Sequence, residues 1–146
     1  MTTKKILTRI ATLDDLQDLA RLNAEFNGFS DLPEHLAKRL ADPFCVEQPL
    51  LAEIDGHVIG FAALRIVPCV FYAAPHGELT ELFVKEAYRR LGVGRELLSL
   101  AEEIAREKGV EELFIITGSS NQVAQTFYNS MGYQDGELAL KRELSA

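Results

Sequence analysis

The segment from residue 78 to residue 108 constrains the fold most, because three kinds of local structure follow one another there without a linker. Residues 78–84 have the pattern of a buried strand, and the spacing of apolar residues predicts a helix over 92–108. A short basic loop containing glycines joins them: Arg89, Arg90, Leu91, Gly92, Val93, Gly94 and Arg95. A helix start carries unpaired N–H groups and the positive end of the helix dipole, and glycine lets an anion approach the backbone. The segment therefore predicts a phosphate-binding loop.

Two common phosphate-binding loops do not fit this segment. A Walker loop ends in Gly-Lys followed by Ser or Thr, and the sequence has no such ending. A dinucleotide-binding fingerprint needs a third glycine where Leu97 stands, and its acidic residue should end the next strand, whereas Glu111 and Glu112 precede that strand. What remains is the pattern Arg-x-x-Gly-x-Gly after an apolar strand.

A second block, over residues 121–133, gives that pattern a specific meaning. Its residues are spaced as Asn-x-x-Ala-x-x-Phe-Tyr-x-x-x-Gly-aromatic: Asn121, Ala124, Phe127, Tyr128, Gly132 and Tyr133. With the glycine loop before it, separated by one helix and one strand, this block resembles the GNAT superfamily of acyl-CoA-dependent N-acetyltransferases. The close match covers residues 78–133, and the first half of the chain shows only the general order of elements.

The elements expected along the chain suit that resemblance. Thr12 offers a helix N-cap, and Asp55-Gly56 is a strong hairpin signal. No repeat or linker interrupts the chain, so a single domain over 1–146 is expected. The resemblance implies an α/β fold, with a central mixed, mostly antiparallel sheet, a splay between the fourth and fifth strands, and flanking helices. Strands are expected over 6–10, 49–54, 57–67, 78–84, 113–117 and 137–144, and helices over 13–27, from 33, over 92–108 and over 121–131.

The charge balance bears on possible partners. The chain has 15 basic and 22 acidic side chains and a net charge of −7. This balance argues against nucleic-acid binding, which needs a basic surface. It would attract a cationic partner, although an acidic surface also simply keeps a protein soluble.

The remaining composition favours a cytoplasmic protein without a metal. No apolar run approaches the roughly 20 residues that span a bilayer, and the start of the chain is too polar for a signal peptide, so no membrane partner is expected. Nothing suggests secretion, so Cys45 and Cys69 are expected to be reduced. The three histidines share no metal-ligand spacing with them: His35, His57 and His76.

The resemblance also implies which residues hold acetyl-CoA as co-substrate. Main-chain groups at the end of the fourth strand would bind the pantetheine arm and polarise the thioester carbonyl, and those of the glycine loop would bind the pyrophosphate. Arg95 either contacts phosphate or faces solvent. Asn121 contacts coenzyme A, caps its helix, or does both. The cofactor-binding residues expected in this way are Leu82, Phe83, Val84, Arg89, Arg90, Leu91, Gly92, Val93, Gly94, Arg95, Asn121 and Tyr128.

Two side chains are candidates for the acid–base chemistry. Tyr128 could donate a proton to the departing sulfur, because a phenol is protonated at neutral pH, or it could be a packed core residue. Glu81 lies in an apolar strand, with Leu79 and Phe83 expected on its face. A charge there is costly unless a site uses it, so Glu81 binds the amine, receives its proton, or lies at the mouth of the cleft. Glu78 is a weaker second candidate.

Several functions stay open at this point. The leading one is acetyl transfer from acetyl-CoA to a primary amine of a small cationic molecule, by direct attack in a ternary complex. A protein or peptide amine is another possible acceptor, and an acyl-CoA-binding sensor without turnover is an alternative of a different class. Residues 67–76, with Phe71 and Tyr72, either shape the acceptor pocket or pack at a sheet edge. Many GNAT proteins are dimers, so a homodimer is possible by resemblance.

Overall fold

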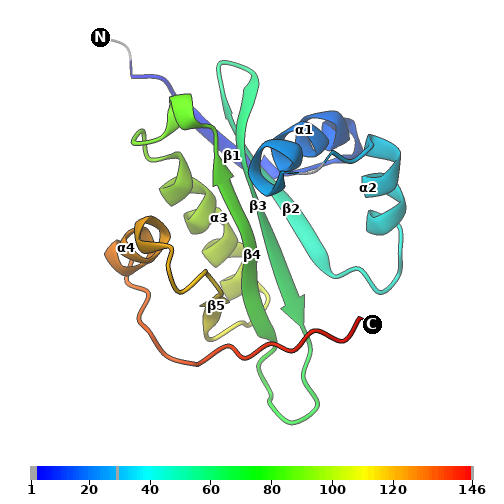
Figure 1. Cartoon of the computed structure of the whole chain (residues 1–146), viewed down its shortest axis with the longest axis vertical. Coiled ribbons are helices and arrows are strands. Elements are labelled where there is room, and N and C mark those ends of the chain that lie inside the picture. Colours follow the sequence, from blue (N-terminus) through cyan, green and yellow to red (C-terminus); the bar gives the residue numbers. More distant parts are fainter. Residues whose placement is uncertain (1–2, 29, 146) are drawn as a thin grey trace. The chain divides into compact units, whose positions relative to one another are not determined.

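The computed structural model describes residues 3–28 and 30–145 (Figure 1). The chain forms two compact units, one ending at Phe114 and one starting at Ile115. The second unit contains the helix α4 (Gln122–Ser130), and the strand β5 (Leu113–Ile115) crosses the boundary. The other elements belong to the first unit: β1 (Ile6–Ile10), α1 (Leu16–Asn27), α2 (Pro33–Leu40), β2 (Glu47–Ile54), β3 (His57–Val67), β4 (His76–Val84) and α3 (Val93–Glu107). Short 3₁₀ turns at 13–15 and 86–88 precede α1 and α3.

The strands form one sheet in the order β1-β2-β3-β4-β5. The first four pair antiparallel with their neighbours, and β5 runs parallel to β4. The predicted mixed α/β fold is therefore confirmed. β5 lies beside the start of β4, where the rings of His76 and Phe114 stack with centroids 5.1 Å apart. Because β5 has three residues and β4 has nine, β5 pairs with only part of β4. The splay beyond that part stays a prediction.

Helices of the first unit cover both faces of the sheet (Figure 1). On one face, α1 packs Leu16, Leu19 and Leu22 against sheet residues that include Phe61 and Phe83, and α2 adds partly buried residues to this cluster. On the other face, α3 buries its apolar stripe, with Leu97 directly below Gly60 of β3. Burying an aliphatic side chain stabilises a fold by about 1.5–3 kcal/mol, so these two layers hold β3 and β4 in place.

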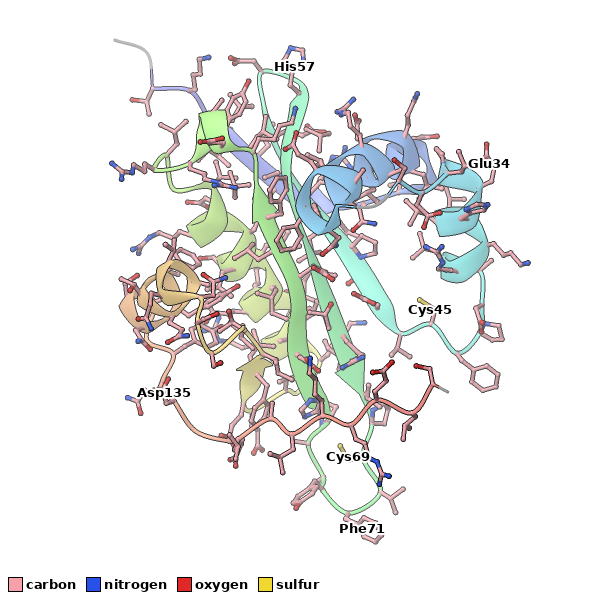
Figure 2. The ribbon with its side chains drawn as sticks, viewed as in Figure 1. Glu34, Cys45, His57, Cys69, Phe71 and Asp135 are labelled. Atoms are coloured by element: carbon pink, nitrogen blue, oxygen red, sulfur yellow. The ribbon has the colours of Figure 1, made fainter. Side chains whose placement is uncertain are left out.

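The loops at the two ends of β3 differ in length and in exposure. At one end, Asp55 and Gly56 both have positive φ, 51° and 77°, as a tight two-residue hairpin requires, so the predicted hairpin is confirmed. At the other end, a longer loop carries Phe71 outward (Figure 2). Phe71 and Tyr72 of this loop are 92% and 76% exposed. These two aromatic side chains therefore do not pack at a sheet edge.

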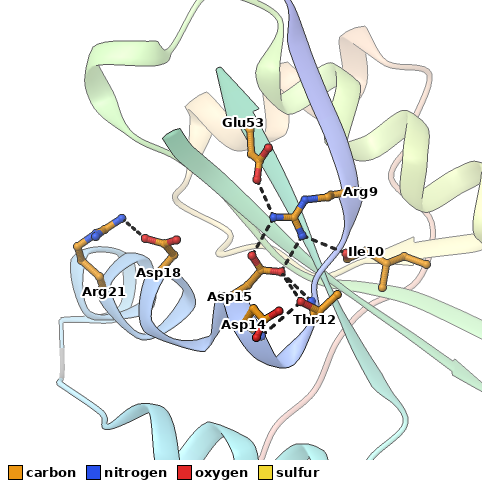
Figure 3. Close-up of polar contacts among 8 residues, drawn as sticks. All are labelled: Arg9, Ile10, Thr12, Asp14, Asp15, Asp18, Arg21 and Glu53. Atoms are coloured by element: carbon orange, nitrogen blue, oxygen red, sulfur yellow. Dashed lines mark hydrogen bonds and ion pairs between the residues drawn. The ribbon is translucent and has the colours of Figure 1, made fainter. Parts of the chain in front are cut away.

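A charged cluster fixes the start of α1 to the sheet (Figure 3). Arg9 of β1 donates two hydrogen bonds to Asp15, at 2.7 and 2.8 Å, and one to Glu53 of β2 at 2.6 Å. Asp15 also accepts the N–H of Thr12, which completes a capping box with the predicted cap residue. The guanidinium holds the pKa of the buried Asp15 carboxyl far below its ordinary value. The cluster therefore sets the direction in which α1 crosses the sheet.

A β-bulge in β4 changes which side chains share a face of the sheet. Ala63 of β3 pairs with Glu81, but the next residue, Leu64, pairs with Leu79, so Thr80 is the extra residue. Paired residues share a face, and neighbours along β3 alternate. Leu79 therefore lies on the opposite face from Glu81, and the expectation that both share one face was wrong. A period of two holds only while no residue is inserted into the ladder.

The expected final strand over 137–144 was also wrong. The alternation of Leu138 and Leu140 with charged residues is present, but the described residues from 134 to 145 form no helix or strand. Both leucines are more than 80% exposed. Alternation specifies two faces, but a strand also needs a partner for its backbone groups, and the local sequence does not supply one. The strand expected over 113–117 is shorter, ending at Ile115.

Candidate active site

The loop after β4 presents the start of α3 without a side-chain cap. Gly92 is the N-cap residue with φ +88°, and no side-chain hydrogen bond caps the first turn. The first backbone bond of the helix runs from Glu96 N to Gly92 O, 3.0 Å. The N–H groups before Glu96 therefore have no partner within the helix, which is the arrangement that binds phosphate. Arg90 also has a positive φ, 65°, which is uncommon for a residue with a side chain.

Arg89 is bound to the strand that precedes the loop. Its Nε donates to the carbonyl oxygen of Val84 at 2.9 Å, and its guanidinium lies 5.8 Å from the centre of the Phe83 ring. Phe83 in turn stacks on Phe26 of α1, with ring centroids 5.1 Å apart. Arg89 thus joins the loop to the end of β4 and, through two rings, to α1.

The register of β3 and β4 shows which main-chain groups at the end of β4 face away from β3. Lys85 N donates to Ile59 O at 2.9 Å, and Phe83 O lies against Gly60. In an antiparallel ladder every second residue faces the neighbouring strand. The main chain of Phe83 therefore faces β3, and the groups directed away from β3 belong to Leu82 and Val84. Since Val84 O accepts from Arg89, the Val84 N–H and both main-chain groups of Leu82 are best placed to meet a ligand.

Glu81 lies beside a second carboxylate on the α1 face of the sheet. Burial raises the pKa of the Glu81 carboxyl above its ordinary value, the negative charge of Glu47 raises it further, and a hydrogen bond from the Asn27 side chain opposes the shift. The hydroxyl of Thr80, the residue before Glu81 in β4, donates to Glu47 Oε1 at 2.5 Å. A carboxylate with a raised pKa takes up a proton more readily at neutral pH, as a general base must.

Glu78, the weaker candidate, is bound by a cation. Arg65 of β3 donates to Glu78 Oε2 at 2.5 Å, and Glu78 is 8% exposed. His76 Nε2 lies 3.9 Å from the same oxygen. The ion pair with Arg65 holds this side chain against β3 and serves the structure of β4. The geometry therefore favours Glu81 over Glu78 as a base.

In the second unit, α4 carries the other predicted residues. Asn121 caps the helix, with its Oδ1 accepting from Ala124 N at 3.1 Å, so its predicted cap is confirmed. The ring of Tyr128 meets Phe127 and Tyr133 edge-to-face, with centroids 5.2 and 6.0 Å away. These contacts fix the ring, and the contribution of Asn121 and Tyr128 to coenzyme A binding stays a prediction.

Comparison with known proteins agrees with the geometry of the loop and sheet. The model of the acetyltransferase (GNAT) family matches residues 13–133. The chain belongs to the GNAT family of acetyltransferases. An uncharacterized N-acetyltransferase of Archaeoglobus fulgidus is 31% identical over 130 residues, covering 84% of this chain and 88% of that protein. An N-alpha-acetyltransferase of Sulfurisphaera tokodaii is 27% identical over 146 residues, covering 90% and 82%. An aminoglycoside N-acetyltransferase solved in complex with coenzyme A superposes with a TM-score of 0.83, at 21% identity and covering 99% and 98%.

Membership of the GNAT family makes this chain an acyl-CoA-dependent N-acetyltransferase. Within residues 3–28 and 30–145, no three His, Cys, Asp or Glu side chains are grouped so that they could hold a metal ion. In the same part of the chain, no helix combines the length and apolar character needed to cross a bilayer.

Sequence reasoning missed three residues around Glu81 in this GNAT chain. Glu47 and Asn27 are 34 and 54 positions away along the chain, and only the folded sheet brings them to Glu81. Thr80 is adjacent, but its role depends on the bulge. The one available signal was the second carboxylate, Glu47, two residues before the strand predicted over 49–54, and nothing local relates it to Glu81.

Proposed function

We propose that the chain transfers an acetyl group from acetyl-CoA to a primary amine of a small cationic molecule, by direct attack of the amine in a ternary complex. The observation that carries the proposal is the half-buried Glu81 carboxylate with its raised pKa, three residues along β4 from Val84, the strand end that leads into the uncapped start of α3. A base and an anion-binding loop on consecutive elements are what this transfer needs.

Glu81 would receive a proton from the attacking amine, directly or through water, as the new N–C bond forms and the C–S bond breaks. The Val84 N–H or a main-chain group of Leu82 would donate to the developing oxyanion and bind the pantetheine arm. The residues from Arg89 to Gly94 would hold the pyrophosphate, mainly through main-chain N–H groups of the loop and the first turn of α3. Arg95 would add charge near the phosphates.

Tyr128 would give its phenolic proton to the departing thiolate, and Asn121 would contact coenzyme A in addition to capping α4. These two roles rest on the match between 121–133 and the family pattern. They complete the proton balance, because the amine loses one proton to Glu81 and the sulfur gains one from Tyr128.

One comparison supports a small-molecule acceptor, and another supports a protein or peptide acceptor. The solved aminoglycoside N-acetyltransferase acts on small amines by its name, and the excess of acidic residues in this chain would attract a cation. The relative from Sulfurisphaera tokodaii is named for acetylation of an α-amine, which favours a protein or peptide acceptor as the second candidate. We further expect a cytoplasmic location.

Titration calorimetry with acetyl-CoA, followed by a thiol-release assay with a panel of amines, tests the proposal. The protein should first be freed of pre-bound ligand and shown to be folded. One-to-one binding and release of thiol with small cationic amines are expected. Release only with peptide amines would favour the second candidate, and binding with no release would favour an acyl-CoA sensor. No binding of acetyl-CoA would contradict all the residue roles.

A further inference from the structure

The last turn of α1 contacts the face of β4 that carries Glu81. The ring of Phe26 stacks on the ring of Phe83, with centroids 5.1 Å apart and an angle of 21° between the planes. Beyond the bulge, Glu81 and Phe83 are two residues apart on β4 and therefore share a face of the strand. Asn27 follows Phe26 in the helix, and its side chain forms a hydrogen bond with the Glu81 carboxylate. Two consecutive residues of α1 thus contact two side chains on one face of β4.

The Asn27 amide is fixed by its own helix. Its Nδ2 donates to Asn23 Oδ1, one turn earlier, at 2.5 Å. The helix ends directly after Asn27, where Gly28 has φ +76° and donates its N–H to Ala24 O at 3.0 Å. An amide nitrogen carries two hydrogens, so one binds Asn23 and the second is available for Glu81. The three side chains therefore form a chain of hydrogen bonds from α1 to β4.

Asn27 is a neutral partner for a carboxylate that has no cationic one. Among residues 3–28 and 30–145, no ion pair includes Glu81. The other charged side chains on this part of the sheet and on the facing helix are Glu47, Glu78, Arg65, Asp18, Arg21 and Glu25. Both arginines are already paired with carboxylates of this set. The hydrogen bond from Asn27 therefore favours the ionised Glu81, against the burial and the charge of Glu47 that raise its pKa.

We propose that Asn27 is a positioning residue of the acetyl transfer: its side-chain amide, anchored by Asn23, fixes the orientation of the Glu81 carboxylate toward the attacking amine. This proposal rests on the proposed function, in which Glu81 receives the proton of that amine. One carboxylate oxygen accepts from Asn27, and the other is left for the amine, directly or through water. Because the hydrogen bond stabilises the anion, Asn27 also keeps Glu81 in the form that accepts a proton.

The titration of Glu81 itself tests this contact without any substrate. In protein labelled with ¹³C at the glutamate side-chain carboxyls, the signal of Glu81 is the one that Glu81→Gln removes. In Asn27→Ala the pKa read from this signal should rise above that of the unmodified protein, because burial and the charge of Glu47 then act unopposed. Asn23→Ala should raise the pKa less, and the double variant should match Asn27→Ala, since Asn23 acts only through Asn27.

The pH profile of thiol release from acetyl-CoA tests the effect on catalysis, with n-pentylamine and the fastest acceptor of the amine panel. Asn27→Ala should lower kcat/KM at pH 7 by about threefold to tenfold, as for the loss of one hydrogen bond, and should move the rise of kcat/KM to higher pH. Thermal unfolding of the same variant measures its stability. A loss of stability with no shift of the profile would show a merely structural role and overturn the proposal.

The variant Gln17→Ala provides the matched control. Gln17 is an exposed amide in the first turn of the same helix, so its removal should change neither the pKa of Glu81 nor kcat/KM. If the unmodified protein binds acetyl-CoA but releases no thiol with any amine, the acetyl transfer itself is wrong and the positioning role falls with it. If the unmodified protein releases thiol and Asn27→Ala keeps both the profile and the pKa of Glu81, only the role of Asn27 is wrong.

Discussion

Arg89 donates its Nε–H to the main-chain carbonyl of Val84 at 2.9 Å, so this side chain is bound to the end of β4 in addition to lying next to the proposed phosphate site. Its guanidinium also lies over the Phe83 ring, at 5.8 Å. The bond occupies a carbonyl that faces away from β3 and ties the loop to β4. Arg89 thereby combines a structural contact with a positive charge beside the proposed pyrophosphate site.

Replacing Arg89 by Gln should weaken acetyl-CoA binding by about threefold to tenfold, the value of one hydrogen bond that orders a loop. Because one partner of Arg89 is a neutral carbonyl, the loss of affinity in this variant should shrink less than the loss of a phosphate contact alone when salt rises from about 0.05 to about 0.5 M. Calorimetry at both salt concentrations checks this. The effect of Arg95→Gln should shrink at high salt if Arg95 contacts phosphate. A similar shrinkage for Arg89→Gln would show that its guanidinium acts mainly on phosphate.

Gly92 allows backbone strain and charge to be tested separately. A Cβ at Gly92 would meet no atom within 4 Å, so Gly92→Ala should cost only the unfavourable positive φ, about 1 kcal/mol of stability. Gly92→Glu adds a carboxylate at the anion-binding helix start and should raise the Kd for acetyl-CoA at least about tenfold beyond the alanine variant. Thermal unfolding and calorimetry measure the two effects. Equal Kd values for the two variants would argue against phosphate binding here.

The raised pKa of Glu81 predicts a shifted pH dependence of the rate. If Glu81 is the base, kcat/KM should rise with pH through a pKa above the ordinary carboxyl range. Glu81→Gln should abolish this rise of kcat/KM with pH and remove most of the activity. A pH series of thiol release with both proteins tests this. If kcat/KM of the variant still rose with pH and its affinity for the acceptor were unchanged, Glu81 would neither accept the proton nor bind the amine.

The same shift has an effect on stability with a defined sign. A carboxyl whose pKa is raised on folding binds protons more tightly in the folded state, so its contribution to the free energy of unfolding falls as pH rises through that pKa. Glu81→Gln should therefore stabilise the protein at pH 7, and the gain should disappear toward pH ~4, where both states are protonated. Urea unfolding at the two pH values gives the comparison. Destabilisation at pH 7 would indicate that the ionised Glu81 is favourably bound.

Tyr128→Phe should lower kcat by at least about tenfold while leaving the Kd for acetyl-CoA within a factor of two, because it removes a proton donor and keeps the ring. The ring contacts with Phe127 and Tyr133 should persist. Full turnover by the Tyr128 variant would assign this tyrosine to packing alone.

The cluster at the start of α1 predicts a large difference between two neighbouring aspartates (Figure 3). Asp15→Asn weakens the ion pair with Arg9 and the capping box, so it should cost about 2 kcal/mol of stability. Asp18→Asn breaks an exposed pair with Arg21 and should cost less than ~0.5 kcal/mol. Since the pKa of Asp15 is lowered, its contribution should be complete above the ordinary carboxyl pKa and should be lost as pH falls through the depressed value. Urea unfolding of both variants checks this, and equal costs would contradict it.

Features set by neighbouring residues could be predicted from the sequence. The capping box at Thr12, the turn at Asp55-Gly56 and the positive φ of Gly109 at the end of α3 all follow from one to four consecutive residues. The phosphate loop belongs to the same class, because it needs only a strand, a glycine turn and a helix start in succession. Together with the spacing of the block over 121–133, these signals were sufficient for the family and for the fold class.

The tertiary structure alone decided the features that depend on pairing across strands. The bulge at Thr80, the bond from Thr80 to Glu47 and the main-chain direction of Phe83 all follow from how β4 aligns with β3. The exposed residues 137–144 show the same dependence, since their alternation was read correctly but no strand formed. A register is chosen by the packing energy of the whole sheet, and a single inserted residue reverses the faces beyond it. The sequence therefore determined which chemistry the chain carries, and the fold decided which side chains meet to perform it.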